Sequence, residues 1–97
     1  MSRRPLTESE LAEALESLEN WYVEDGKLAT RRRLPTFPGA IAFVQQVADL
    51  AEELQHHPDI DIRWRTVTLA VNTHDAGNVI TASDVELARR VDGLAAS

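Results

Sequence analysis

Three histidines, gathered into two short segments, are the residues of this chain best suited to chemistry. His56 and His57 stand directly before Pro58, and His74 lies further along the chain. Imidazole is the one side chain whose unperturbed proton equilibrium lies near neutral pH, so it can donate or accept a proton under ordinary conditions. The concentration of all three in two segments points to acid–base catalysis, to a zinc site, or to a merely solvated surface.

The first histidine segment is predicted to end a long helix. Apolar residues recur at helical spacing before it, at Phe43, Val47, Leu50 and Leu54. Pro58 cannot continue a helix, so His56 and His57 are expected in the last turn or the cap region. Glu52 lies four residues before His56, and Glu53 lies four before His57. We therefore expect each histidine to have a carboxylate on its own face of the helix, where it would orient the ring.

Composition narrows the class of protein. A chain of 97 residues is predicted to form one domain, residues 1–97, because that length supports a modest core but not two. The chain has no cysteine, which excludes disulfides, thiolate metal ligands and cysteine nucleophiles. Its net charge of −6 disfavours nucleic acid and anionic lipid as partners. There is no apolar run of membrane-spanning length and no secretory signal, so we expect a soluble cytoplasmic protein.

The elements that must position the histidines alternate between helices and hairpins. Thr7 and Glu10 have the form of a capping box, which predicts an amphipathic helix over residues 8–19. Asp25-Gly26 is a hairpin turn between two β-prone runs, the second of which extends to about Leu34. Strand alternation sends Arg31 and Arg33 to one face and Arg32 to the other. We interpret the arginines as a solvated face rather than a phosphate site.

The second half repeats the same order. Thr36 and Pro38 predict the start of the long helix. Apolar residues then change parity between 60–64 and 67–71, which predicts a hairpin bending near Arg65-Thr66. Cap candidates at residues 81–84 begin a final helix. The predicted fold is α+β, in the order α-β-β-α-β-β-α, with a four-stranded antiparallel sheet and three helices on one face.

The residue pattern alone leaves several alternatives open. Neighbouring residues on a helix project about 100° apart, so His56 and His57 are poorly placed to share one metal ion, and no metal is expected. Trp21 and Trp64 are typical of core residues, although a tryptophan near a cleft can stack on a flat heteroaromatic ring. Asp84 is typical of a helix first turn rather than of a catalytic group.

The spacing of these residues resembles the signature of the pterin-4a-carbinolamine dehydratases, which are also called 4a-hydroxytetrahydrobiopterin dehydratases. The signature runs through Glu52, His56-His57-Pro58, Trp64, His74 and Asp84, and the resemblance extends over about residues 11–94. One departure follows the last histidine. Family members commonly have a Gly-Gly run there, whereas residues 77–81 of this chain read Gly-Asn-Val-Ile-Thr, with a single glycine and one residue more.

The resemblance implies a small enzyme that dimerises or forms tetramers and removes water from a 4a-hydroxytetrahydropterin without metal or organic cofactor. Carried over by position, the catalytic residues would be His56, His57 and His74. The substrate-binding residues would be Gln55, Pro58, Trp64, Asn72, Thr73 and Asp75, and the supporting residues would be Trp21, Glu52 and Asp84, with Glu52 beside the first histidine. The alternatives are a non-enzymatic protein-association module, as in transcription or assembly, and a zinc-binding regulator.

Overall fold

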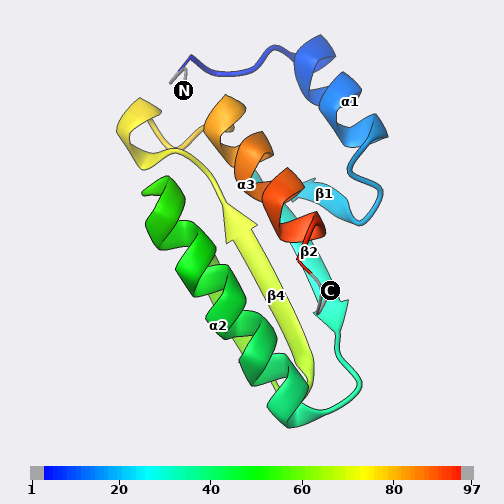
Figure 1. Ribbon diagram of the computed structural model, residues 1–97. Helices are drawn as coiled ribbons and strands as arrows, with labels where there is room; N and C mark the ends of the chain where they lie inside the picture. The colour runs from blue at the N-terminus through cyan, green and yellow to red at the C-terminus, as the bar shows by residue number, and fades with distance from the viewer. Residues whose placement is uncertain (1–3, 95–97) are drawn as a thin grey trace.

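The computed structural model describes residues 4–94 and has the element order that the sequence predicts (Figure 1). The elements are α1 (Glu8–Glu16), β1 (Trp21–Glu24), β2 (Lys27–Arg33), α2 (Phe37–Leu54), β3 (Asp59–Arg63), β4 (Thr66–Val71), the short 3-10 helix η1 (His74–Ala76) and α3 (Ala82–Asp92). The predicted order α-β-β-α-β-β-α is therefore confirmed. None of the helices within residues 4–94 has the length and apolar character that crossing a membrane requires.

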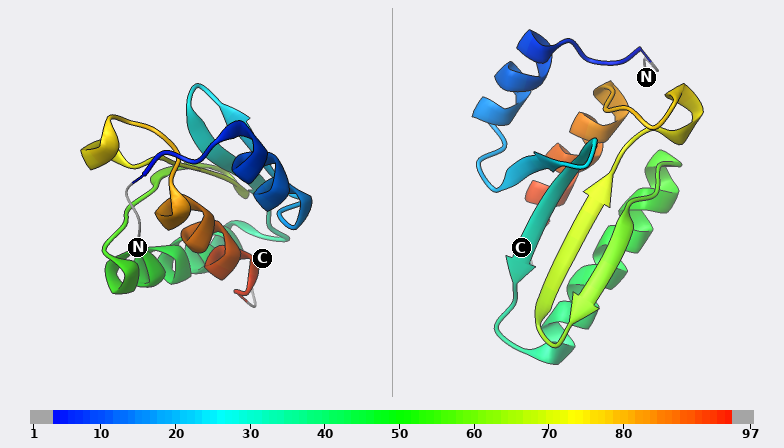
Figure 2. Two further views of the ribbon diagram at one scale, coloured as in Figure 1. Left: turned by 90° about the horizontal axis from the view of Figure 1, so that it is seen from above. Right: turned by 180° about the vertical axis from the view of Figure 1, so that it is seen from behind.

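The four strands form one antiparallel sheet in the order β1-β2-β4-β3. The two hairpins meet at its centre, where Leu28 of β2 lies opposite Val71 of β4. Alternate residues of β4 are buried, and Val67 and Leu69 point with Val71 into the core. Helices α2 and α3 cover this face, and the other face is left open, as the view from behind shows (Figure 2). The sheet thereby brings the end of β4 beside the start of β3.

A threonine side chain caps the start of each of the three α-helices within residues 4–94. Thr7 and Glu10 form the predicted capping box of α1, and the Oγ1 atom of Thr36 accepts a hydrogen bond from the Gly39 N–H at 3.0 Å at the start of α2. Helix α1 ends at Glu16, three residues before the predicted end at 19. Ser17 caps the helix, and Leu18 follows it into the core.

Trp21 belongs to the core rather than to a cleft. Its ring is buried, and its Nε1 atom donates to Asp92 of α3 at 2.9 Å. Arg32 lies over the same ring, 5.8 Å from its centroid, and also binds Asp92. The predicted alternation of the arginines is confirmed, since Arg31 and Arg33 are exposed while Arg32 is half-buried on the helix side. This cluster ties the first hairpin to α3.

The second hairpin turns one residue earlier than the sequence predicts. Trp64 and Arg65 form the turn, and Thr66 already pairs with Arg63 as the first residue of β4. The backbone of Arg65 accepts a hydrogen bond from the Leu34 N–H at 2.8 Å. Trp64 can occupy the turn because it adopts a left-handed conformation, with φ +57. The turn lies at the opposite end of β3 and β4 from the histidine segments.

Candidate active site

The two adjacent histidines lie just beyond the end of α2. Gln55 caps the helix in a left-handed conformation, with φ 52, and its side-chain Nε2 donates to the Glu52 carbonyl at 2.7 Å. The His56 N–H then reaches back to the Ala51 carbonyl at 3.0 Å, which closes the helix end. The sequence allowed the last turn or the cap. His56 lies in the cap region, as the sequence allowed, and His57 lies one residue beyond it. Because both residues follow the last helical residue, Leu54, the argument that helical geometry separates their rings does not apply to them.

All three histidines line one cavity of about 400 Å³. Its lining residues are Leu54, Gln55, His56, His57, Asn72, Thr73, His74, Asp75 and Ser83. The two histidine segments meet because the strands that join them are paired. Asp59, directly after Pro58, pairs with Ala70, which lies two residues before Asn72 at the start of the second segment. A volume of this size is typical of a small-molecule site. Sequence reasoning missed Leu54 and Ser83, which contribute to the wall without carrying a distinctive motif.

His56 is held by a buried carboxylate from another element. Its Nε2 atom lies 2.5 Å from Oδ1 of Asp84, whose side chain is 0% exposed while that of His56 is 17% exposed. No hydrogen bond within residues 4–94 uses Nδ1 of His56. With Nε2–H turned to the carboxylate, the lone pair of a neutral ring lies on Nδ1. In this tautomer, Nδ1 is the nitrogen of His56 that can accept a proton.

Asp84 has two tasks at once. It is the N3 residue of the capping box of α3, and its Oδ2 accepts from the Thr81 N–H at 2.8 Å. The same oxygen accepts from the Thr73 hydroxyl at 2.9 Å, and the two threonine hydroxyls lie 2.7 Å apart. The sequence indicated the first-turn position correctly but not the contact with His56. The helix cap therefore fixes the carboxylate, and the carboxylate orients the ring.

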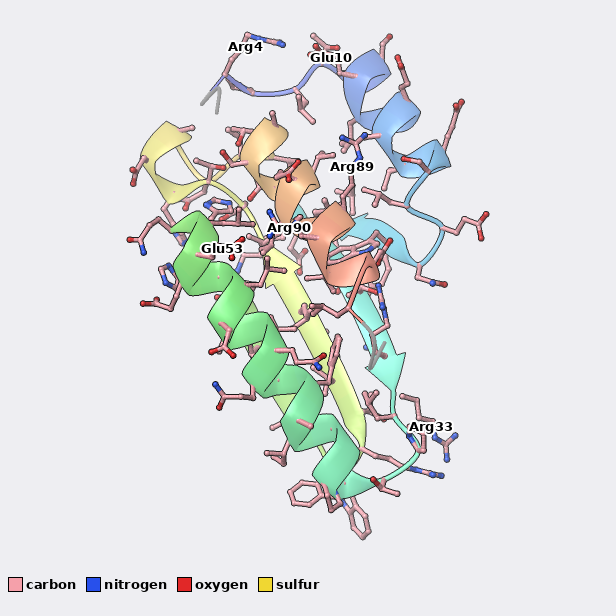
Figure 3. All side chains as sticks on the ribbon, viewed as in Figure 1. Arg4, Glu10, Arg33, Glu53, Arg89 and Arg90 are labelled. Carbon is pink, nitrogen blue, oxygen red and sulfur yellow. The ribbon has the colours of Figure 1, made fainter. Side chains whose placement is uncertain are left out.

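The predicted pairing of glutamates with histidines is wrong. Glu52 contacts His57 rather than His56, with 2.5 Å between Oε2 and Nε2, and both side chains are largely exposed, at 71% and 57%. Glu53 instead forms an ion pair with Arg90 of α3, and Figure 3 shows these two side chains facing each other between the helices. The left-handed Gln55 breaks the helical register, so a spacing of four residues no longer selects the partner.

His74 lies on the other wall of the cavity, at the start of η1, and its side chain is exposed. The longer loop after it is closed by its own backbone, since the Thr73 N–H donates to the Val79 carbonyl at 2.8 Å. Gly77 and Asn78 both take left-handed conformations, with φ 94 and 61, which lets the loop turn back within few residues. The additional residue is thus absorbed without removing His74 from the cavity.

Asn72 supplies a buried polar atom without a partner. Its Nδ2 donates to the Asn78 carbonyl at 3.2 Å, which identifies the other terminal atom as the amide oxygen. That Oδ1 atom is buried and has no hydrogen bond within the described part of the chain. Buried polar atoms are normally satisfied, so an orphaned acceptor in a residue that lines a cavity is a candidate ligand contact.

Two of the predicted substrate-binding residues, Trp64 and Pro58, do not line the cavity, and neither does the predicted supporting residue Trp21. Trp64 is 87% exposed at the far hairpin turn, Trp21 is in the core, and Pro58 only joins the second histidine to β3. The resemblance places Trp64 among the substrate-binding residues, but in this structure the length of β3 separates it from the cavity. In residues 4–94, no group of three or more histidine, aspartate or glutamate side chains has the arrangement of a metal site.

Comparison with known proteins adds independent information. The family model for pterin 4 alpha carbinolamine dehydratase matches residues 4–94. The chain belongs to the pterin-4a-carbinolamine dehydratase family. A relative from Nocardia farcinica that is named for this family is 44% identical over 95 residues, which cover 98% of this chain and 99% of the relative. Another from Roseiflexus castenholzii is 49% identical over 89 residues, which cover 92% and 95%.

Two solved structures of the dehydratase family share the fold. A transcriptional coactivator/pterin dehydratase from Brucella melitensis superposes with a TM-score of 0.86 at 34% identity, covering 93% of this chain and 97% of that one. A pterin dehydratase-like protein described as a RuBisCO assembly factor in the alpha-carboxysome has a TM-score of 0.63 at 26% identity, covering 79% and 88%. The family thus includes proteins whose names refer to protein association as well as to chemistry.

Proposed function

We propose that this chain is a hydro-lyase that converts a 4a-hydroxytetrahydropterin to the quinonoid dihydropterin in pterin cofactor recycling, in the cytoplasm. The observation that carries the proposal is the contact between His56 and the buried Asp84 at the wall of a cavity that also holds His57 and His74. A protein-association surface alone has no need of an imidazole oriented by a fully buried carboxylate. Membership of the dehydratase family supplies the substrate class.

The reaction requires two proton transfers that balance. The bond from C4a to the hydroxyl oxygen breaks, its electron pair leaves with the oxygen, and an acid gives that oxygen a proton to form water. A base removes the proton from the neighbouring ring nitrogen, and the freed pair forms the new double bond to C4a. Histidine can perform either task.

His56 is the proposed base. Its Nδ1 atom makes no hydrogen bond within residues 4–94, and Asp84 would stabilise the imidazolium that forms when Nδ1 takes the proton. His57 and His74, which line the same cavity, are the proposed proton donors to the leaving oxygen. The proton can return from His56 to the donors through water, so the enzyme ends the cycle unchanged.

The cavity also offers groups that would orient a pterin. The unpaired Oδ1 of Asn72 can accept from an N–H of the ring, and Gln55, Thr73 and Asp75 surround the same space. Satisfying a buried acceptor on binding favours the ligand, because the unbound state leaves that acceptor without a partner. These residues are proposed as substrate contacts and the histidines as the catalytic group.

We also propose that the working form is a homodimer or homotetramer. The four-stranded sheet has two edge strands, β1 and β3. Their outward N–H and C=O groups can form hydrogen bonds when another copy of the chain pairs with an edge. Light scattering at micromolar concentration should give a multiple of the chain mass of 10.8 kDa. A mass equal to one chain would contradict this part of the proposal.

The decisive experiment for the activity is a dehydration assay. A 4a-hydroxytetrahydropterin is generated in place by a hydroxylase, and the appearance of quinonoid dihydropterin is followed with and without the purified protein. The proposal expects a large acceleration over the spontaneous reaction, retained after dialysis against a chelator. No acceleration at any protein concentration would overturn the enzyme proposal and leave a protein-association module, the role that the RuBisCO assembly factor's name gives that relative.

A further inference from the structure

The open face of the sheet carries arginines that the proposed reaction does not use. Arg31 and Arg33 of β2 are exposed on this face, which Figure 2 shows without a covering helix. Their side chains form no ion pair or hydrogen bond with any residue from 4 to 94. The sequence predicts a solvated face for these two arginines, but it could not show that a third arginine, from the other hairpin, lies on the same face.

The register of the strands brings the third arginine beside the other two. Thr66 of β4 pairs with Arg33 of β2 on one side and with Arg63 of β3 on the other. Paired residues point to the same face of a sheet, and neighbouring strands lie about 4.8 Å apart. The backbones of Arg33 and Arg63 are therefore about 10 Å apart, with a threonine between them. At this spacing, two long cationic side chains can contact one ligand.

The next row of the sheet completes a pocket. Thr68 pairs with Arg31 on one side and with Asp61 on the other. The pocket has a volume of about 590 Å³, and its lining residues are Arg31, Asp61, Arg63, Thr66 and Thr68. It lies on the open face near the start of β4, whereas the histidine cavity lies beyond the end of that strand. The pocket is therefore separate from the candidate active site.

The pocket has an excess of positive charge, although the net charge of the chain is −6. Elsewhere on the open face, Lys27 of β2 is neutralised by Asp59 of β3, at 2.5 Å. In the pocket, Asp61 accepts only from Nε of Arg63, at 3.2 Å, so both Nη atoms of Arg63 have no hydrogen bond within residues 4–94. Because the whole chain repels anions, a local excess of cations is what an anionic ligand requires.

We propose that this pocket binds a phosphate monoester of a small hydroxylated molecule. Guanidinium groups hold phosphate oxygens through paired N–H donors, and the two threonine hydroxyls add donors between the arginines. The Oδ2 atom of Asp61 has no hydrogen bond in the described part of the chain, and it can accept from a hydroxyl of the ligand. A simple ester such as methyl phosphate lacks that hydroxyl and is repelled by the same carboxylate. The pocket should therefore prefer the hydroxylated ester.

Titration with ribose 5-phosphate tests the site directly. Amide chemical shifts of the ¹⁵N-labelled protein are followed by NMR at low salt, where charge attraction is least screened. We expect saturable changes centred on residues 31–33 and 61–68, with a dissociation constant on the order of 1 mM or below. Changes spread evenly over the surface, or centred on the histidine cavity, would overturn the proposal. No pterin is present, so the result does not depend on the proposed function.

Arginine substitutions test whether the pocket itself holds the phosphate. Arg31→Gln and Arg63→Gln should each weaken binding about tenfold, because each removes charge-assisted hydrogen bonds. Arg31→Lys should restore only part of the loss, since an ammonium lacks the planar fork. The matched control is Arg89→Gln, which removes the same charge from α3, away from Arg33 (Figure 3), and should leave binding within about twofold. An equal loss in the control would reduce the binding to general charge attraction and overturn the site.

The role of Asp61 gives effects of opposite sign on two ligands. In the parent, ribose 5-phosphate should bind about tenfold more tightly than methyl phosphate, because only the first offers a hydroxyl to Oδ2. Asp61→Ala removes both the repulsion and the acceptor, so methyl phosphate should bind more tightly than to the parent and the preference should disappear. Equal binding of the two esters by the parent, or a preference that survives in Asp61→Ala, would overturn the assignment of a hydroxylated ester.

Discussion

Two contacts between a histidine and a carboxylate stand side by side in this molecule and differ almost only in burial. His56 with Asp84 and His57 with Glu52 each join a ring Nε2 to a carboxylate oxygen at 2.5 Å. Asp84 is 0% exposed and bonded by two threonines, whereas Glu52 and His57 are mostly in solvent. An exposed pair is screened by water and contributes little, while a buried carboxylate cannot exchange its partner for water. The comparison assigns His56 the fixed orientation that a base requires.

The largest expected difference is in rate. Replacing His56 by alanine should lower the dehydration rate about 10²- to 10⁴-fold, because it removes the proposed base. The assay is dehydration of 4a-hydroxytetrahydropterin at saturating substrate, with circular dichroism to verify the fold. A His56→Ala variant that keeps the parental rate would remove His56 from the mechanism.

The next largest expected difference is in the free energy of unfolding, which alanine should lower more at His56 than at His57. His56→Ala leaves Oδ1 of the buried Asp84 without its partner and should cost about 1–3 kcal/mol in free energy of unfolding. His57→Ala breaks only an exposed contact and should cost within about 0.5 kcal/mol. Urea unfolding followed by circular dichroism measures both. Equal costs would mean that burial of the carboxylate does not matter to the fold.

The smallest expected effect concerns Glu10, a solvent-exposed carboxylate far from the cavity, which can be compared with the buried Asp84. Arg4 hydrogen-bonds Glu10 at 2.8 and 2.9 Å, as Figure 3 places them, and with the Thr7 N–H it lowers the pKa of Glu10 to about 2. A depressed carboxyl pKa gives stability that is present above the ordinary value near 4.5 and is lost as pH falls towards about 2.

Glu10→Gln should therefore reduce the dependence of unfolding on pH only below about 4.5, and only slightly, because the pair is exposed. Unfolding midpoints of the variant and the parent are compared between neutral pH and pH 2.5. A parallel pH dependence of the two curves throughout that range would contradict the role of Arg4.

The sequence predicted the scaffold well because its signals are local. The capping box at Thr7, the Asp25-Gly26 turn and the change of parity around Trp64 each depend on neighbours within a few residues. The order of elements and the side of Arg32 followed from them. Such signals specify what each segment forms, and chain connectivity leaves few ways to pack the result.

The sequence could not predict the partners within the site. Asp84 and His56 are 28 residues apart and meet only because α3 begins beside the end of α2. Glu52 contacts His57 rather than the predicted His56, because the left-handed residue Gln55 ends the helical register before the histidines. The resemblance to the dehydratase family supplied the candidate residues of the site, but their contacts depend on long-range packing that the spacing of residues in the chain does not predict.

The most direct test of the account changes each carboxylate to its amide and compares the dehydration rates. In Asp84→Asn, the Thr81 N–H still requires an oxygen on the side of the helix cap, so the amide NH₂ must face His56. The ring must then accept through Nε2 and carry its proton on Nδ1, which removes the base.

We expect Asp84→Asn to lose about 10²- to 10⁴-fold in rate while keeping its fold, in the range of general acid–base catalysis. Glu52→Gln, in which the exposed amide can rotate freely, should stay within a few-fold of the parent. Equal rates for the two variants, or a greater loss in Glu52→Gln, would contradict the claim that the buried carboxylate makes His56 the base.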